Sequence, residues 1–231
     1  KRLCKGTPGD GDREFIMSNK GGIVNEHPLE LTKEDLDNPA FKLIHTSCNG
    51  HLDGELHKLR EAGVPISYDM SGRWNQEYYI ETIGPQVDIA FASCGDTPEE
   101  EIKKLVSSEG QGLPYDRGDQ GRKGFPDLWT ESQYYTQKPK LVDAVDTLGA
   151  GDSFATAFLL AMLEKKDIHA AMEAGAEFAA KTCLVNGAFG HGIASRKNKR
   201  KISYMSEPAA GRISGIPPCC RGYSFLFDLP F

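Results

Sequence analysis

The sequence contains no long hydrophobic run. The longest apolar stretch is 155–163, which includes Thr156, whereas a helix that crosses a bilayer needs about 20 consecutive apolar residues. No secretory signal pattern is visible at the start of the sequence. We therefore expect a cytoplasmic protein that has no membrane partner.

Paired cysteine motifs are also missing. None of the six cysteines forms a Cys-x-x-Cys pair, which argues against a zinc site or a disulfide framework and indicates reduced thiols. Three histidines at equal spacing, His45, His51 and His57, do not share one helix face as a metal-binding pair would. A substrate contact by His51 and a surface or packing role for it both stay open. The cysteines stand at positions 4, 48, 94, 183, 219 and 220.

An excess of basic residues is lacking from most of the chain. The net charge is −6, and residues 196–231 hold seven Lys or Arg against two acidic residues, which leaves the body near −11. An acidic body argues against nucleic acid as a substrate or partner. The basic cluster 196–201 is either a patch that binds nucleic acid or an anionic surface, or a solvated tail. No dinucleotide-binding Gly-x-Gly-x-x-Gly follows a strand, and no Walker lysine motif is present.

What the sequence does contain is an alternation of strand and helix patterns. Strands are predicted at 41–46, 64–69 and 87–92, and a helix at 53–62 that ends before a glycine. A further helix is predicted to open at 97–100, where Thr, Pro and Glu form a capping pattern. This alternation predicts a parallel α/β core.

A glycine-rich heptapeptide, 146–152, joins a predicted strand at 141–145 to a predicted helix at 153–163. The helix has an apolar stripe at helical spacing, and its N-terminus directs free N–H groups and a positive dipole at the turn. An anion is expected to bind there. Asp152 is placed to take a proton from a substrate hydroxyl, and the alternative is that it only caps the helix.

The string Asp-Thr-x-Gly-Ala-Gly-Asp resembles the signature of the ribokinase-like (PfkB) carbohydrate kinases. The resemblance implies a three-layer α/β/α core with a mostly parallel sheet. It also implies that the backbone of Gly149, Ala150 and Gly151 forms an anion hole and that Asp152 is the catalytic base. Asp146 and Thr147 would lie near a monovalent cation.

Two strand ends extend the resemblance. Residues 66–74 resemble the family's strand that ends in Asp with Arg-Trp nearby, and 91–93 resemble the Phe-Ala-Ser of fructoselysine and related fructosamine kinases. The resemblance places four residues near substrate, phosphate or magnesium: Asp69, Arg73, Ser93 and Asp96. Ser93 and Asp96 stand where most sugar kinases of the family carry Asn-x-x-Glu.

Residues 178–190 resemble the closing helix and loop of fructosamine 6-kinases, which border the nucleotide site. Asn186 and Gly187 are accordingly predicted to adjoin the adenine, and the alternative is a polar pair that caps the helix.

The activity implied by the resemblance is ATP-dependent phosphorylation of a sugar hydroxyl by a fructosamine (fructoselysine-type) 6-kinase. ATP and Mg²⁺ are the implied cofactors, with K⁺ as a further candidate, and a sugar or glycated amino acid is the implied partner. A different sugar or nucleoside kinase and an inactive truncated kinase that keeps only an anion or nucleotide site are the alternatives. A homodimer occurs in the family, although the loss of lid strands argues against one here.

Three parts of the chain are expected. Residues 1–30 would be a remnant of the lid and N-terminal region, 31–195 the core with an irregular stretch at 109–130, and 196–231 a basic and then apolar tail that is disordered or non-native. The front and lid strands are expected to be largely absent. Compensating frame shifts in the coding sequence are one hypothesis for 109–130 and the tail, and resequencing the gene tests it.

Overall fold

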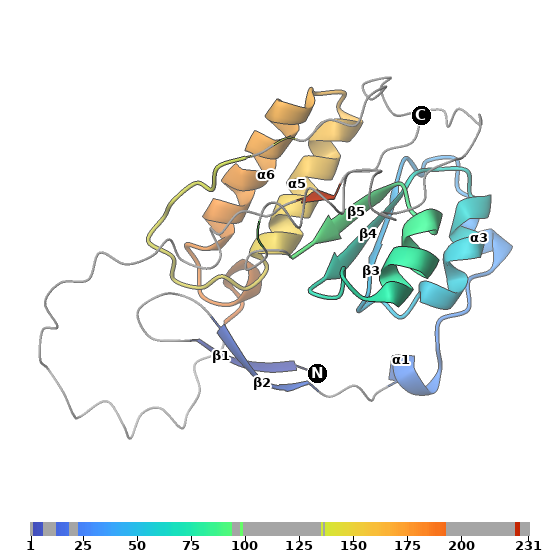
Figure 1. Ribbon diagram of the computed structural model, residues 1–231, viewed down its shortest axis with the longest axis horizontal. Coiled ribbons are helices and arrows are strands. Elements are labelled where there is room, and N and C mark those ends of the chain that lie inside the picture. The colour runs from blue at the N-terminus through green and yellow to red at the C-terminus, as the bar shows by residue number, and fades with distance from the viewer. Residues whose placement is uncertain are drawn as a thin grey trace, which may run out of the picture.

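The computed structural model describes residues 2–6, 13–18, 23–93, 98, 135, 137–192 and 225–226. Figure 1 shows a four-stranded sheet with helices on both faces and a separate two-stranded hairpin. Asp96, the helix predicted to open at Thr97, the stretch 109–130 and the basic cluster 196–201 lie outside the described residues, apart from Pro98.

The main sheet has the strand order β3-β4-β5-β6. The first three strands are parallel, as predicted: β3 Ile44–Ser47, β4 Ile66–Ser71 and β5 Ile89–Ala92. The fourth strand, β6 Phe225–Leu226, pairs antiparallel with β5. These two residues belong to the apolar tail that is predicted to be disordered or non-native, and they supply a ladder partner for one edge of β5.

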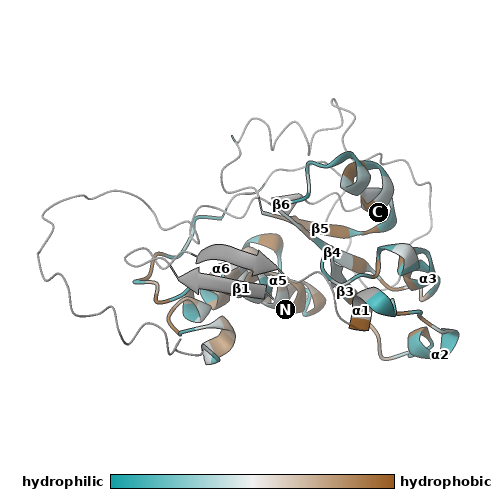
Figure 2. Cartoon of the chain, turned by 90° about the horizontal axis from the view of Figure 1, so that it is seen from below, coloured by the Kyte–Doolittle hydropathy of each residue, from teal (hydrophilic) through white to brown (hydrophobic). Residues whose placement is uncertain are grey.

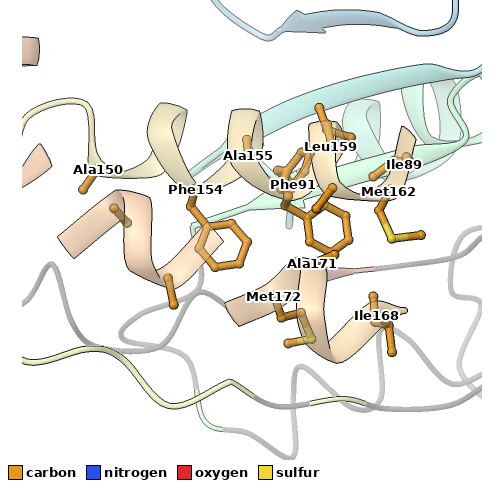
Figure 3. Packing of buried hydrophobic residues seen from close by; sticks show 14 of the residues in the cluster. Ile89, Phe91, Ala150, Phe154, Ala155, Leu159, Met162, Ile168, Ala171 and Met172 are labelled. Atoms are coloured by element: carbon orange, nitrogen blue, oxygen red, sulfur yellow. The ribbon is translucent and has the colours of Figure 1, made fainter. Parts of the chain in front are cut away.

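Two long helices, α5 Ala150–Leu163 and α6 Ile168–Thr182, lie side by side against one face of the sheet (Figure 1). Their inner residues form one core with β5, as Figure 3 shows. Phe158 has an exposed fraction of 1%, stacks beside Phe154 and meets the ring of Phe91 edge-on. The apolar stripe predicted for the helix is therefore the surface that packs on the sheet.

The contact between α5 and α6 is close at two places. A Cβ added to Gly175 would lie 2.8 Å from the ring of Phe154, so α6 needs glycine there. At the other place, the hydroxyls of Ser153 and Thr182 form a buried hydrogen bond of 2.6 Å.

The opposite face of the sheet is covered by α3 Leu56–Glu61, which follows the 3₁₀ turn η1 Asp53–Glu55. The π-helical turn η2 Tyr78–Ile83 and the 3₁₀ turn η3 Gly84–Gln86 complete this layer. Figure 2 shows polar colours on the outer side of α3, whereas β5 is apolar. The three-layer α/β/α arrangement predicted from the sequence is confirmed.

The second core, on the α3 face, contains fully buried side chains from β4 and from the covering turns. They are Leu56, Ile66, Tyr68, Met70 and Ile83, none more than 1% exposed. The remaining short elements are α1 Ile23–Glu26, α2 Lys33–Leu36, η4 Ala188–Gly190, and the antiparallel hairpin of β1 Arg2–Gly6 and β2 Arg13–Ser18.

The strand predicted at 141–145 is wrong. The segment is not part of a sheet, although Val142 and Ala144 pack against the core while Leu141 and Val145 are exposed. The N–H of Val145 donates instead to the carbonyl of Cys183 at the end of α6, at 2.8 Å. No helix within the described ranges is long and apolar enough to span a membrane.

Candidate active site

The glycine turn before α5 is built by backbone conformation. Gly149 occupies the N-cap position with φ +85°, in the left-handed region that favours glycine. The helix begins at Ala150, three residues before the predicted start at Ser153. Asp152 therefore lies in the first helical turn, with an exposed side chain. The alternative that Asp152 caps the helix is wrong, because Gly149 holds that position.

The backbone N–H groups of this turn divide into two sets. The N–H of Ala150 donates to the carbonyl of Thr147 at 3.2 Å, and that of Ser153 donates to Gly149 at 2.9 Å. Across the part of the chain that the structure describes, the N–H groups of Gly151 and Asp152 donate to no protein acceptor. They lie at the positive end of α5, where an anion is stabilised. The geometry therefore offers an anion two free donors, while the N–H of Ala150 already has a partner.

Asp146 connects the turn to a second loop. Its side chain is only 5% exposed; Oδ1 accepts from the N–H of Leu148 at 3.0 Å and Oδ2 from the N–H of Gly187 at 2.7 Å. Thr147 supplies the carbonyl that receives the N–H of Ala150. Both residues thus organise the turn, and their contact with a monovalent cation stays a prediction.

The loop 186–192 lies directly over the glycine turn. Gly187 has φ +73°, and a Cβ there would overlap the backbone nitrogen of Gly192. A Cβ on Gly149 would lie 3.5 Å from Cζ of Phe189, so the ring of Phe189 is in contact distance of the turn. The C-cap of α6 is Cys183, so Asn186 and Gly187 are not the capping pair of that helix.

Asp69, in the second half of β4, lies within electrostatic range of Asp152. Its Oδ1 accepts from the N–H of Ser71 at 2.7 Å, and Ser71 has a left-handed φ of +52°. Desolvation raises the pKa of Asp69, and the negative charge of Asp152 raises it further, although the Ser71 N–H works in the opposite direction. The structure thus brings together two of the predicted site residues from distant parts of the sequence.

Arg73 and Ser93 are held by other contacts. Nη1 of Arg73 donates to the hydroxyl of Tyr79 at 2.9 Å and to the carbonyl of Cys48 at 3.3 Å. The hydrogen bond to Tyr79 raises the pKa of Arg73. The N–H of Ser93 donates to Ser71 at 2.9 Å. Tyr79 belongs to the core on the α3 face, so Arg73 is anchored on the side of the sheet away from α5.

Sequence reasoning missed His45. Its Nδ1 lies 3.0 Å from Oγ of Ser67, and its ring is in electrostatic range of Asp69 and Asp152. His51, the histidine considered from the sequence, is exposed and has φ +57°. The missed signal was the strand alternation, which places the exposed His45 and the buried Ser67 on the face of the sheet toward α5.

Comparison with known proteins agrees with this geometry. The model of the pfkB family of carbohydrate kinases matches residues 56–190. A fructosamine kinase of Bacillus subtilis, FrlD, is 39% identical over 80% of this chain and 65% of its own length. The fructoselysine 6-kinase of Escherichia coli is 29% identical over 78% of this chain and 67% of its own length.

Among solved structures, the microbiome-derived acarbose kinase Mak1 superposes with a TM-score of 0.52 at 22% identity, over 77% of this chain and 60% of that one. This likeness concerns the fold, which is that of the ribokinase-like kinases. The chain spans about two thirds of the length of the curated relatives it matches. Because the family model covers more than half of the sequence and includes the turn that carries Asp152, the chain belongs to the pfkB family of carbohydrate kinases.

Proposed function

We propose that this chain phosphorylates a sugar hydroxyl with ATP, as a fructosamine 6-kinase of the fructoselysine type. The observation that carries the proposal is the position of Asp152, in the first turn of α5 beside the free N–H groups of Gly151 and of its own backbone. The fructosamine and fructoselysine kinases among the relatives support the choice of acceptor.

The chemistry divides between the side chain and the backbone. The carboxylate of Asp152 takes the proton from the sugar hydroxyl. At the same time, the oxygen of that hydroxyl attacks the γ-phosphorus of ATP. The new phosphorus–oxygen bond forms in line with the bond to the leaving oxygen of ADP, which breaks. The free N–H groups and the positive end of α5 stabilise the charge on the transferring phosphoryl group.

ATP is proposed to extend from this turn toward the loop 186–192, with Asn186 and Gly187 beside the adenine. No group of three or more His, Cys, Asp or Glu within the described ranges forms a metal-ligand set. Mg²⁺ is proposed to arrive with the ATP phosphates, whose charge it neutralises, and Asp69 lies on the same side of the sheet as α5. A K⁺ ion near Asp146 and Thr147 remains part of the proposal, as do a cytoplasmic location and a small-molecule acceptor.

The test compares the chain with its Asp152→Asn variant, using fructoselysine, fructose and ribose as acceptors with ATP and Mg²⁺. We expect fructoselysine-dependent ADP release that falls by about 10²- to 10⁴-fold in the variant, since the amide cannot accept the proton. Turnover with fructose or ribose alone would assign a different acceptor. Nucleotide binding without turnover by any acceptor would contradict the proposed activity and favour an inactive anion site.

A further inference from the structure

The face of the sheet toward α5 is apolar on β5 and polar on β3 and β4. Parallel pairing aligns His45 with Ser67 and Ile89 in one row, and Ser47 with Asp69 and Phe91 in the next. Residues paired across neighbouring strands point to the same side of a sheet. Ile89 and Phe91 enter the core beneath α5 and α6, so His45, Ser67 and Asp69 lie on that same face.

The hydroxyl of Ser67 fixes the imidazole of His45. Ser67 is fully buried, with an exposed fraction of 0%, and its Oγ lies 3.0 Å from Nδ1 of His45. A buried hydroxyl needs an acceptor for its proton, and Nδ1 is the acceptor at hand. The ring also meets Phe91 edge-on, with centroids 6.1 Å apart, which limits its rotation.

We assign the tautomer of His45 from this contact and from the need of the buried Ser67 hydroxyl for an acceptor. If Nδ1 accepts from Ser67, the ring proton of the neutral imidazole is on Nε2. The carboxylates of Asp69 and Asp152, both in electrostatic range, favour an N–H on the ring nitrogen that Ser67 does not use. Desolvation lowers the pKa of His45, although these two carboxylates act in the opposite direction.

We propose that His45 is a substrate-contacting residue, whose Nε2–H donates a hydrogen bond to an oxygen of the acceptor sugar beside Asp152. The inference rests on the proposed function. It adds a hydrogen-bond donor to a site that already holds the carboxylates of Asp69 and Asp152. A polyol matches that set, because a hydroxyl can donate to a carboxylate and accept from an imidazole.

Two substitutions separate this role from a structural one. In His45→Asn, the amide oxygen stands near the position of Nδ1 and still accepts from Ser67, but no group reaches the position of Nε2. In His45→Gln, the longer amide brings an N–H near the position of Nε2. The matched control is His57→Gln, because His57 is an exposed histidine on α3, which covers the other face of the sheet.

The experiment is a calorimetric titration of each variant with fructoselysine, in the presence of Mg²⁺ and a non-hydrolysable ATP analogue. We expect His45→Asn to weaken fructoselysine binding by about tenfold, the worth of one hydrogen bond, and His45→Gln to recover part of the loss. Affinity for the ATP analogue is expected to stay unchanged in both, and His57→Gln is expected to bind fructoselysine like the original chain.

Equal fructoselysine affinity in His45→Asn and the original chain would overturn the inference. So would a parallel loss of fructoselysine and ATP-analogue affinity that His45→Gln does not recover, since that pattern marks a structural role. Both outcomes leave the proposed kinase standing. Failure of the original chain to bind fructoselysine at all would overturn the proposed acceptor and this inference together.

Discussion

The two faces of β4 differ in kind, one apolar and one polar. Ile66, Tyr68 and Met70 point into the core under α3 and are at most 1% exposed. Ser67 and Asp69, which alternate with them, point to the side of α5 and carry hydrogen bonds to His45 and Ser71. One strand thus contributes stability through one face and a polar site through the other.

The polar groups on the two faces also differ in how well their surroundings stabilise them. On the α3 face, the hydroxyl of Tyr68 donates to Oδ1 of Asp53 at 2.5 Å, and burial raises the pKa of Tyr68 so that it stays protonated. On the α5 face, the carboxylate of Asp69 is partly desolvated close to a second carboxylate, which raises its pKa. The first arrangement satisfies a polar group, whereas the second holds a charge where ionisation is unfavourable, as binding and catalytic sites often do.

The sharpest test of the apolar face is Ile66→Ala. Ile66 is 0% exposed, so the substitution removes buried methyl groups and leaves a cavity. We expect the free energy of unfolding to fall by about 2–5 kcal/mol, measured by denaturant titration. Leu160→Ala is the control, because Leu160 is 55% exposed on α5, and a change within about 0.5 kcal/mol is expected there. A loss below about 1 kcal/mol for Ile66→Ala would contradict a well-packed core on this face.

The buried hydrogen bond between Ser153 and Thr182 tests how α5 and α6 are held together on the polar side of β4. Ser153→Ala removes one of two hydroxyls joined at 2.6 Å and leaves that of Thr182 buried without this partner. We expect a loss of about 1–3 kcal/mol in the free energy of unfolding, and partial recovery in Ser153→Ala with Thr182→Val, where both hydroxyls are gone. A double-mutant cycle measures the coupling. Additive losses in the double variant would show that the hydrogen bond contributes nothing specific.

Sequence patterns predicted the parts of the molecule that depend on local order. The strands β3, β4 and β5 follow short apolar runs, and α5 follows a stripe at helical spacing, so the residue pattern alone identifies both kinds of element. The start of α5 was placed too late, because the φ of +85° at Gly149 lets the glycine itself occupy the N-cap.

Features that depend on tertiary contacts could not be predicted. A strand is predicted at 141–145, yet the N–H of Val145 donates to the carbonyl of Cys183 at the end of α6, which no local pattern encodes. The bond from Gly187 to Asp146 spans 41 positions, and the pairing of His45 with Ser67 needs the register of two strands. Local patterns thus identified Asp152 as a candidate base, but the groups around it depend on how distant segments pack.

The smallest expected effect on the free energy of unfolding comes from the charge of Asp69, on the polar face of β4. The sign of this effect separates the polar face from the apolar one, because the charge is expected to lower stability. The pKa of Asp69 is raised in the folded chain above its ordinary value of 3.8, so the folded state resists ionisation more than the unfolded state does. The stability of the original chain should therefore decrease as pH rises from that value through the raised pKa, and change no further from this group above it. Asp69→Asn removes this penalty, and its amide oxygen can still accept from Ser71.

The free energy of unfolding of Asp69→Asn should accordingly equal that of the original chain in acid and exceed it above the raised pKa. Turnover of the variant should fall, because Asp69 is proposed to lie near the substrate. Denaturant unfolding at a series of pH values, from about the ordinary Asp pKa to neutrality, measures the difference. A variant that is less stable than the original chain at neutral pH would mean that the ionised carboxylate stabilises the fold. The polar face of β4 would then contribute to stability as the apolar face does, and the contrast between them would be lost.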